Sequence, residues 1–165
     1  MYQQETRDRQ RTTACAVPGN IPLAIRLFLI GLVLLGLTAA CTRQPSYPAA
    51  LQEGLDFVID PSGLQPDHPQ FYTYLYQDKK ISYFVLRIDG QVSSFLDACA
   101  SCYSHKQGYR HDDGAVTCRY CNMRFPVYKL EKGLGSCYPI KIDGRMENGK
   151  YRIPVATLIA SADKF

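Results

Sequence analysis

Hydrophobic and polar positions alternate along much of the chain after residue 55, which is the pattern of β-strands rather than helices. Residues 71–77 (FYTYLYQ) alternate aromatic and polar side chains, and residues 81–88 (ISYFVLRI) are more continuously apolar, which predicts a buried strand. The Asp89–Gly90 pair that follows is a strong hairpin signal and leads into a third predicted strand, residues 91–98. These segments predict a β-meander whose last strand ends beside Cys99.

Shorter strands and turns are predicted for the rest of the chain. Short strands are expected within residues 55–60, 111–118, 123–130 and 141–155. Residues 132–140 (KGLGSCYPI) predict a loop, because glycine and proline interrupt them. Only residues 155–165 are expected to form a helix. The predicted fold is therefore mainly β, a small α+β domain with a β-meander and a short C-terminal helix.

The longest apolar run lies near the N-terminus, at residues 27–40 (LFLIGLVLLGLTAA). A membrane-spanning helix needs about 20 residues, whereas the apolar region of a secretory signal has about 7–15 and ends in small side chains. Cys41 follows directly, and LTAAC resembles a bacterial lipoprotein signal, in which the cysteine is lipidated and becomes the mature N-terminus. The alternative is an uncleaved anchor, extended through residues 21–25, with Arg26 reaching toward the interface.

Charge predicts the orientation of this segment. All four arginines before residue 27 precede the apolar run and should stay in the cytoplasm, so that the rest of the chain faces outward. Residues 1–40 are thus expected to be a cytoplasmic tail with a lipoprotein-type signal or membrane anchor, and residues 41–54 a polar, proline-bearing tether. Residues 55–165 are expected to form a domain at the periplasmic or cell-surface face of the membrane.

Composition excludes several classes of function. The chain has 165 residues, of which 46% are hydrophobic and 21% charged, as is usual for a folded protein. Residues 41–165 carry 15 Lys and Arg against 13 Asp and Glu, without a basic stripe, so nucleic acid is not an expected partner. No Ser–His–Asp set or pair of carboxylates stands out, so a hydrolase is not expected either.

The cysteine spacing carries the main chemical signal. Cys99 and Cys102 form one Cys-x-x-Cys pair, Cys118 and Cys121 form another, and 15 residues lie between the pairs. A Cys-x-x-Cys turn can point both sulfurs to one side, and two such knuckles separated by a hairpin commonly close a tetrahedral four-sulfur site. The spacing therefore predicts a ribbon-like metal site. Disulfides, which persist outside the cytoplasm, are the alternative.

The sequence leaves the identity of the metal open. Soft thiolates select zinc, iron–sulfur clusters or copper(I). Cys137, in a Gly- and Pro-containing loop (GSCYP), is a fifth candidate ligand, and because clusters take four cysteines, one thiol would be left for exchange, capping or a disulfide. His105 and His111 could also ligate, although a histidine in a loop is more often only solvated. Six aromatic residues near the cysteines could form a sheath that tunes a cluster or, equally, the core of a small β domain: Tyr103, Tyr109, Tyr120, Phe125, Tyr128 and Tyr138.

The ordered set DACASC, GY, CRYC, RFPV and GSCYP, preceded by YFVLRIDGQVSSFLDAC and followed by YRIPVATLIASADKF, resembles the FtrD-like family of membrane iron–sulfur-containing proteins over about residues 70–165. The resemblance implies an extracytoplasmic, membrane-attached domain, with Cys137 matching the fifth cysteine of the family. It implies that the iron–sulfur centre is bound by Cys99, Cys102, Cys118 and Cys121. FtrD-like proteins are associated with iron-uptake systems that handle iron redox at the membrane. Larger members carry the domain on a multi-helix membrane part, whereas this chain has at most one hydrophobic segment. A permease or redox partner is therefore expected to be a separate protein.

The sequence thus leads to the hypothesis of a membrane-anchored electron carrier, rather than an enzyme, with an iron–sulfur or mononuclear iron centre that serves iron transport or respiration. One alternative is a zinc-ribbon-like module whose metal is structural and whose surface binds a membrane partner. Another is a metal carrier that passes iron or copper to a permease and uses Cys137 or His105 as an exchangeable ligand.

Overall fold

The computed structural model describes residues 22–25, 27–29, 44–133 and 135–165. The predicted lipidation site, Cys41, and most of the predicted signal segment lie outside these ranges. Residues 23–25 and 27–29 are helical. In the described ranges, no helix is both long enough and apolar enough to cross a membrane.

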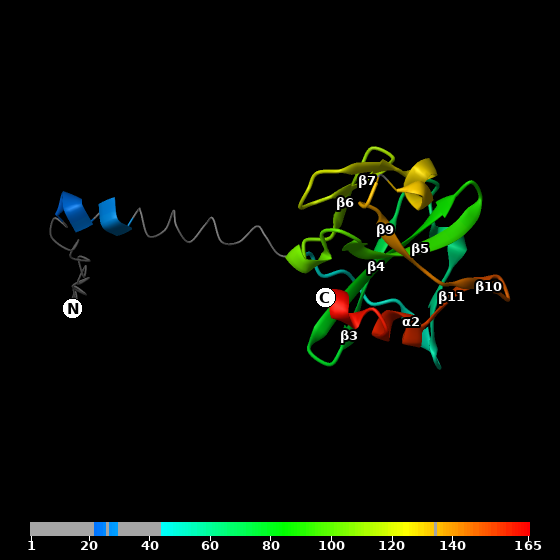
Figure 1. Cartoon of the computed structure of the whole chain (residues 1–165). Coiled ribbons are helices and arrows are strands. Elements are labelled where there is room, and N and C mark those ends of the chain that lie inside the picture. Colours follow the sequence, from blue (N-terminus) through cyan, green and yellow to red (C-terminus); the bar gives the residue numbers. More distant parts are fainter. Residues whose placement is uncertain (1–21, 26, 30–43, 134) are drawn as a thin grey trace, which may run out of the picture. The chain divides into compact units, whose positions relative to one another are not determined.

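The predicted meander forms the central sheet of the domain. Its strands lie in the order β3 (Gln70–Tyr76), β4 (Lys79–Ile88), β5 (Gln91–Cys99) and β9 (Pro139–Ile142), each antiparallel to its neighbour (Figure 1). Asp89 and Gly90, with φ angles of 48° and 82°, make the turn between β4 and β5, as a type I′ hairpin requires. Residues 81–86 of β4 are all buried, which confirms the buried strand predicted there.

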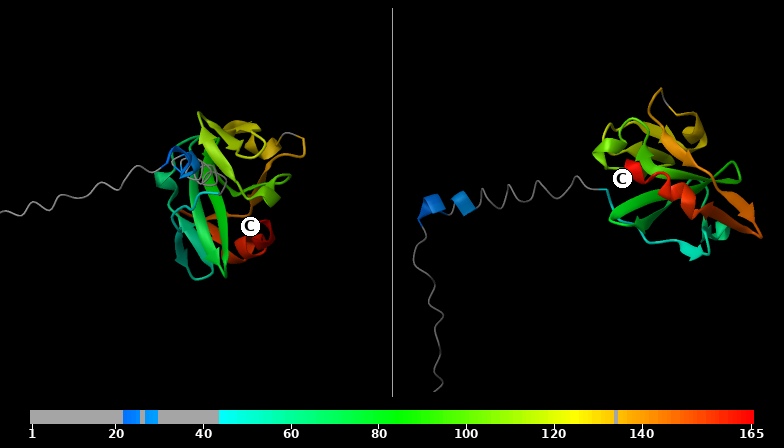
Figure 2. Two further views of the ribbon diagram at one scale, coloured as in Figure 1. Left: turned by 90° about the vertical axis from the view of Figure 1, so that its left-hand side faces the viewer. Right: turned by 60° about the horizontal axis from the view of Figure 1, so that its bottom comes forward.

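Two smaller sheets flank this meander. One has the order β1 (Leu51–Glu53), β2 (Asp56–Ile59), β11 (Lys150–Pro154) and β10 (Arg145–Glu147). The other has the order β6 (Tyr109–Asp112), β7 (Ala115–Cys118) and β8 (Arg124–Pro126). Figures 1 and 2 show the β6–β8 sheet on one side of the central sheet, with β2, β11 and the short helix α2 (Val155–Ile159) on the other.

The central sheet is buried on both faces because it separates two apolar cores. The first core consists of Phe57, Ile59, Leu64, Ile81, Tyr83, Val85, Leu96, Ala98, Ile142, Tyr151, Ile153, Val155, Leu158 and Phe165. The second, here called the cysteine core, consists of Phe84, Leu86, Phe95, Cys99, Cys102, Tyr109, Val116, Cys118, Phe125, Val127 and Leu130. Successive side chains of a strand point to opposite faces, so β4 and β5 contribute to both cores and read as nearly continuous apolar runs. In β5 this alternation delivers Cys99 to the cysteine core.

Several elements differ from the sequence-based expectation. Only Arg124–Pro126 of the predicted strand at residues 123–130 is extended, and Val127–Lys132 forms a 3-10 helix that buries Val127 and Leu130. These two side chains are three residues apart and so lie on the same face of a 3-10 helix, a spacing that strand periodicity does not reveal. The predicted C-terminal helix is also divided, into α2 and a 3-10 turn at Ala162–Lys164.

The described part of the predicted tether, residues 44–54, contacts the domain. It includes β1, whose three residues are all exposed and which pairs with β2. No apolar alternation marks such an edge strand, so the sequence pattern did not predict it. Closer to the N-terminus, the Tyr47 backbone N–H donates to the Thr73 hydroxyl at 2.9 Å, and the Gln44 N–H donates to the Lys106 carbonyl at 3.3 Å.

Candidate metal centre

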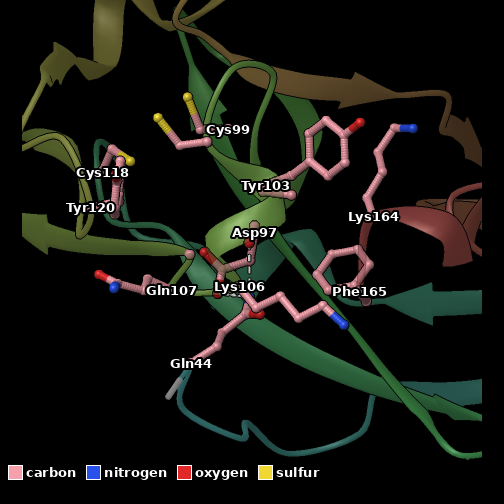
Figure 3. A pocket seen from close by; sticks show the side chains of 13 residues that line it. Gln44, Asp97, Cys99, Tyr103, Lys106, Gln107, Cys118, Tyr120, Lys164 and Phe165 are labelled. Atoms are coloured by element: carbon pink, nitrogen blue, oxygen red, sulfur yellow. Dashed lines mark hydrogen bonds between the residues drawn. The ribbon is translucent and has the colours of Figure 1, made fainter. Parts of the chain in front are cut away.

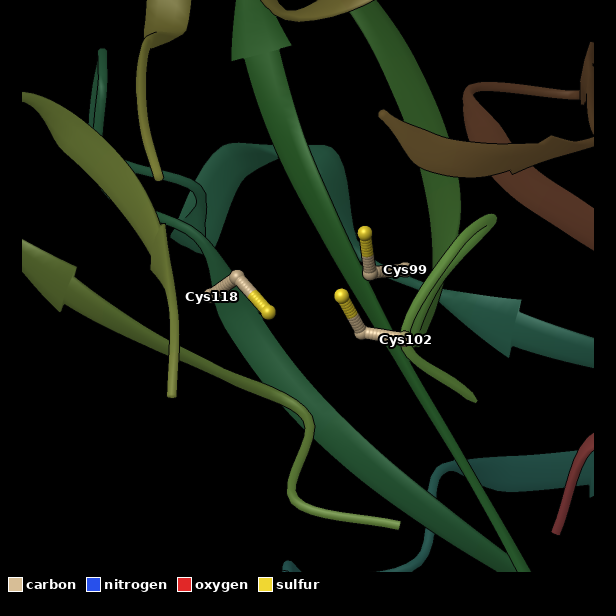
Figure 4. Close-up of side chains that lie close together, drawn as sticks. All are labelled: Cys99, Cys102 and Cys118. Carbon is tan, nitrogen blue, oxygen red and sulfur yellow. The ribbon is translucent and has the colours of Figure 1, made fainter. Parts of the chain in front are cut away.

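Three separate segments bring five cysteines to one end of the cysteine core. Cys99 ends β5, and Cys102 lies in the turn that follows it; Cys118 ends β7, and Cys121 lies in the turn toward β8. Cys137 comes two residues before β9. All five are free thiols. In Figure 4, the sulfur of Cys118 points toward the adjacent sulfurs of Cys99 and Cys102.

Backbone hydrogen bonds shape the two Cys-x-x-Cys turns. The Cys102 N–H donates to the Cys99 carbonyl at 3.1 Å. In the second turn the Asn122 N–H donates to the Cys118 carbonyl, and the Cys118 N–H donates to the Met123 carbonyl, both at 3.0 Å. Asn122 has a φ of 56°, in the left-handed region that asparagine tolerates better than most residues. Each turn therefore returns the chain so that both cysteines of a pair lie near the same end of the core.

Hydrogen bonds to the turn between Cys99 and Cys102 explain why Cys137 reaches the site. The Ala100 N–H donates to the Tyr138 carbonyl at 3.0 Å, and the Ser101 hydroxyl donates to the Ser136 carbonyl at 2.7 Å. These bonds hold the residues on both sides of Cys137 against the turn between Cys99 and Cys102. The fifth cysteine is thus part of the cluster and not an isolated loop residue.

The five sulfurs form two overlapping groups of three. The sulfurs of Cys99, Cys102 and Cys118 lie within 4.8 Å of one another, and so do those of Cys102, Cys121 and Cys137. We call these sets the inner triad and the outer triad; they share Cys102. Among the described residues no larger group meets this limit. The sulfurs of Cys99, Cys102, Cys118 and Cys121 are therefore not all within 4.8 Å of one another, as they would be in a simple ribbon site.

Burial distinguishes the two triads. Every cysteine of the inner triad is buried, with exposed fractions of 3% for Cys99, 9% for Cys102 and 2% for Cys118. Cys121 is exposed and Cys137 is half-buried. The site therefore has a protected side within the cysteine core and a side that faces solvent.

The surroundings divide the thiols into more and less acidic ones. Burial raises the pKa of Cys99, but hydrogen bonds to its sulfur lower it by more, so that the net shift is downward. The donors include the Tyr109 hydroxyl and the backbone N–H groups of Ser101 and Cys102. Burial also raises the pKa of Cys121, but hydrogen bonds from the Met123 N–H and from the Cys118 and Cys102 thiols together outweigh it, so that this pKa is lowered as well. Burial and the neighbouring thiolates raise the pKa of Cys102 and Cys118. A bound cation would offset this repulsion by attracting all the thiolates.

The aromatic residues around the cysteines only partly form a sheath. Tyr109 and Phe125 are buried in the cysteine core. The Tyr109 hydroxyl is buried, and it lowers the pKa of the Cys99 thiol. The other four lie partly exposed on the surface: Tyr103, Tyr120, Tyr128 and Tyr138. Burial against apolar side chains thus applies to the inner triad, whereas tyrosines border the solvent-facing side.

Neither hairpin histidine joins a triad. The exposed His105 ring stacks on Tyr120, with the ring centroids 3.4 Å apart and the planes at 9°. The His111 ring packs edge-on against His68, with centroids 4.9 Å apart. Metal-ligating groups of three among the described residues contain only cysteines. The structure therefore places both histidines outside the sulfur cluster.

A buried carboxylate that the sequence analysis did not select lies beside the inner triad. Asp97 is 1% exposed and accepts a hydrogen bond from the Tyr109 N–H at 2.6 Å. It accepts another from Gln44 Nε2 at 2.7 Å (Figure 3). Burial raises its pKa to about 6 despite these donors. Gly108 lies so close that an added Cβ would be 2.6 Å from both carboxylate oxygens. Asp97 lies two residues before Cys99 and therefore on the same face of β5, toward the cysteine core. This strand alternation could have predicted from the sequence that Asp97 lies beside the site.

These residues fit a thiolate-bound metal centre, including an iron–sulfur cluster. A cluster needs four cysteine thiolates, and five free thiols converge here from three segments. Backbone N–H groups act on the sulfurs of Cys99, Cys118 and Cys121, as expected where negative charge is to be stabilised. The same donor set also suits zinc or mononuclear iron, because these metals take four sulfur ligands as well.

Comparison with known proteins agrees with this donor set. The family model described as "Membrane iron-sulfur containing protein FtrD-like" matches residues 64–165, a region that contains all five clustered cysteines. No curated protein and no solved structure gave a match. Since the family model covers most of the chain and the whole candidate site, this chain belongs to the FtrD-like family of membrane iron–sulfur-containing proteins.

Proposed function

We propose that this protein is a membrane-anchored electron carrier whose cysteines hold an iron–sulfur or mononuclear iron centre outside the cytoplasm. The observation that carries the proposal is the convergence of five free thiols with one buried and one exposed side. When bound, the iron centre supplies a one-electron redox couple. The chain itself supplies thiolate ligands, N–H donors and an apolar wall.

Each side of the site has a distinct role in this proposal. The inner triad and the Tyr109 ring keep water from most of the centre, which limits loss of the metal. Cys121, which is exposed, gives a docked redox partner a short path to the centre. No enclosed substrate cavity is needed for this function, because electrons pass between redox centres over short distances without a bound substrate.

The short sequence distance between Cys41 and Gln44 supports a partner in or at the membrane. The Gln44 side chain is bonded to Asp97, two residues before Cys99. A lipidated Cys41 would stand three residues before Gln44, and three extended residues span at most about 11 Å. The proposed anchor would thereby hold the centre close to the lipid surface. A separate permease of an iron-uptake system, or a respiratory redox protein, would then be the partner.

A zinc-containing structural module is the second candidate. The specific observation in its favour is the close spacing of the sulfurs in each triad, at most 4.8 Å. Tetrahedral zinc, with metal–sulfur bonds of about 2.3 Å, sets sulfurs about 3.8 Å apart. A mononuclear iron site would have a similar spacing, so the metal itself must be measured.

Protein purified without oxygen from its native membrane tests the proposal. The expected result is a coloured protein with sulfur-to-iron charge-transfer absorption that bleaches reversibly on reduction, together with stoichiometric iron by elemental analysis. Acid-labile sulfide would identify a cluster, and its absence a mononuclear centre. A colourless protein with stoichiometric zinc would end the electron-transfer proposal. Cys99→Ser should lose the colour, while Ser104→Ala, a change at an exposed position in the same segment, should keep it.

A further inference from the structure

The arrangement of the cysteines contains more ligands than the centre needs. Four thiolates complete an iron–sulfur or tetrahedral zinc site. The fifth, Cys137, lies within 4.8 Å of Cys102 and Cys121, but it is not in a common group with Cys99 and Cys118. The position of Cys137 would be explained if it bound the metal together with Cys102 and Cys121 only, and not in the completed four-cysteine centre.

We propose that the outer triad, Cys102, Cys121 and Cys137, is a loading site through which a metal cation enters and leaves the centre. The inference rests on the proposed function in that it assumes a metal centre at these cysteines. In the loading state the cation is held by the three outer-triad thiolates. In the final state the cation lies deeper and has four ligands: Cys99, Cys102, Cys118 and Cys121. Cys137 is then released.

Solvent access supports the direction of this path. A hydrated cation arriving from solvent meets exposed Cys121 and half-buried Cys137 before it can reach Cys99 and Cys118, which are 3% and 2% exposed. Burying a bare cation is strongly unfavourable unless ligands replace its water. The outer triad offers three such ligands at the surface, and shared Cys102 lets the cation move inward without first losing them all.

Proton transfer to and from solvent balances each step of the path. Each thiol gives up one proton to solvent as it binds the cation, and Cys137 takes one back when it is released. No oxidant or reductant is involved.

The Ser136 and Tyr138 carbonyls, through their bonds to Ser101 and Ala100, keep Cys137 at the site in the absence of a metal–sulfur bond. A released Cys137 would therefore remain beside Cys121, ready to take part in the next exchange. The ligand chemistry points to borderline or soft cations such as ferrous iron, zinc or copper(I). Hard, oxygen-seeking cations such as calcium would not be loaded.

Stopped-flow measurement of cobalt(II) uptake by the reduced full-length chain, in detergent and without oxygen, tests the inference. Cobalt(II) reports thiolate coordination by its absorption. Cys137→Ser should slow both uptake and release to a chelator by about tenfold, which corresponds to about 1.4 kcal/mol in the barrier, and should leave the final spectrum and stoichiometry unchanged. Cys99→Ser should keep rapid uptake but bind cobalt more weakly, with a different spectrum. Ser104→Ala, a change at an exposed position without a role at the site, should match the unaltered protein.

Two results would overturn the loading site. One is a Cys137→Ser protein with unchanged uptake and release rates. The other is a Cys137→Ser protein whose final spectrum differs, because Cys137 would then be a permanent ligand. Failure of the electron-transfer proposal looks different: native protein would contain zinc without iron, while the cobalt rates could still depend on Cys137. The two ideas are thus tested separately.

Discussion

Two buried tyrosines near the central sheet differ in how their hydroxyl groups are satisfied. The Tyr83 hydroxyl is buried with no hydrogen-bond partner, whereas the Tyr151 hydroxyl lies 2.9 Å from that of Ser94. A buried polar group without a partner destabilises the folded state, and a paired one contributes about 1 kcal/mol. Tyr83→Phe should therefore leave the free energy of unfolding unchanged or raise it, and Tyr151→Phe should lower it by about 1 kcal/mol. Urea unfolding of both variants measures the difference, and a larger loss for Tyr83→Phe would contradict this account.

Gly108 shows how closely the wall of the metal site is packed. Its φ is 65°, and an added Cβ would lie 2.6 Å from the Asp97 carboxylate oxygens. Gly114 has a similar φ of 68°, but an added Cβ there would meet nothing within 4 Å. Both Gly→Ala changes add backbone strain of about 1 kcal/mol, and overpacking adds about 1–3 kcal/mol at Gly108 alone. Thermal or urea unfolding should rank Gly108→Ala as clearly less stable than Gly114→Ala; equal losses would mean that Asp97 can move aside.

Among the structural elements, the strands with a clear period of two were predictable and the irregular segments were not. Residues 71–98 gave three strands at nearly the observed bounds, because aromatic–polar alternation and the Asp89–Gly90 turn act locally. The edge strand β1 pairs with the adjacent strand β2, but its exposed side chains show no apolar alternation. The 3-10 helix at Val127–Lys132 buries Val127 and Leu130 in the cysteine core, which includes segments distant in the sequence. The cysteine spacing predicted one site, but Cys137 joins the outer triad because residues 136 and 138 bond to the turn after β5. Local sequence does not encode that contact.

The contact between the Cys137 loop and the first cysteine turn is itself testable. Ser101→Ala removes the 2.7 Å bond to the Ser136 carbonyl. Hydrogen–deuterium exchange of the Ala100 N–H, which donates to Tyr138 in the same contact, should become faster by several-fold, since an exposed hydrogen bond contributes about 0.5–1.5 kcal/mol. Ser104→Ala should leave the exchange unchanged. Unaltered exchange in Ser101→Ala would show that the backbone bond alone holds the loop.

At the scale of the whole molecule, the two cores imply unequal dependence on the metal. The first core contains only apolar and aromatic side chains, most of them from the central and β2–β11 sheets and the rest from α2, the C-terminus and the loop at Leu64. The cysteine core, in contrast, has three thiols among its buried residues. The β6–β8 sheet consists of short strands and packs on the cysteine core alone. Short sheets have little stability of their own, so this part should rely most on the bound metal.

Removal of the metal should therefore loosen the β6–β8 sheet before the rest of the domain. Binding to the folded state alone stabilises it by about 2.7 kcal/mol when free metal is at 100 times its dissociation constant, and a chelator removes that contribution. Hydrogen exchange followed by mass spectrometry, with and without chelator under reducing conditions, should show faster exchange in peptides covering residues 109–126. Peptides covering β2 and β11 serve as the internal control and should change little. A uniform increase across the domain would mean that the two cores unfold together and that the metal stabilises both.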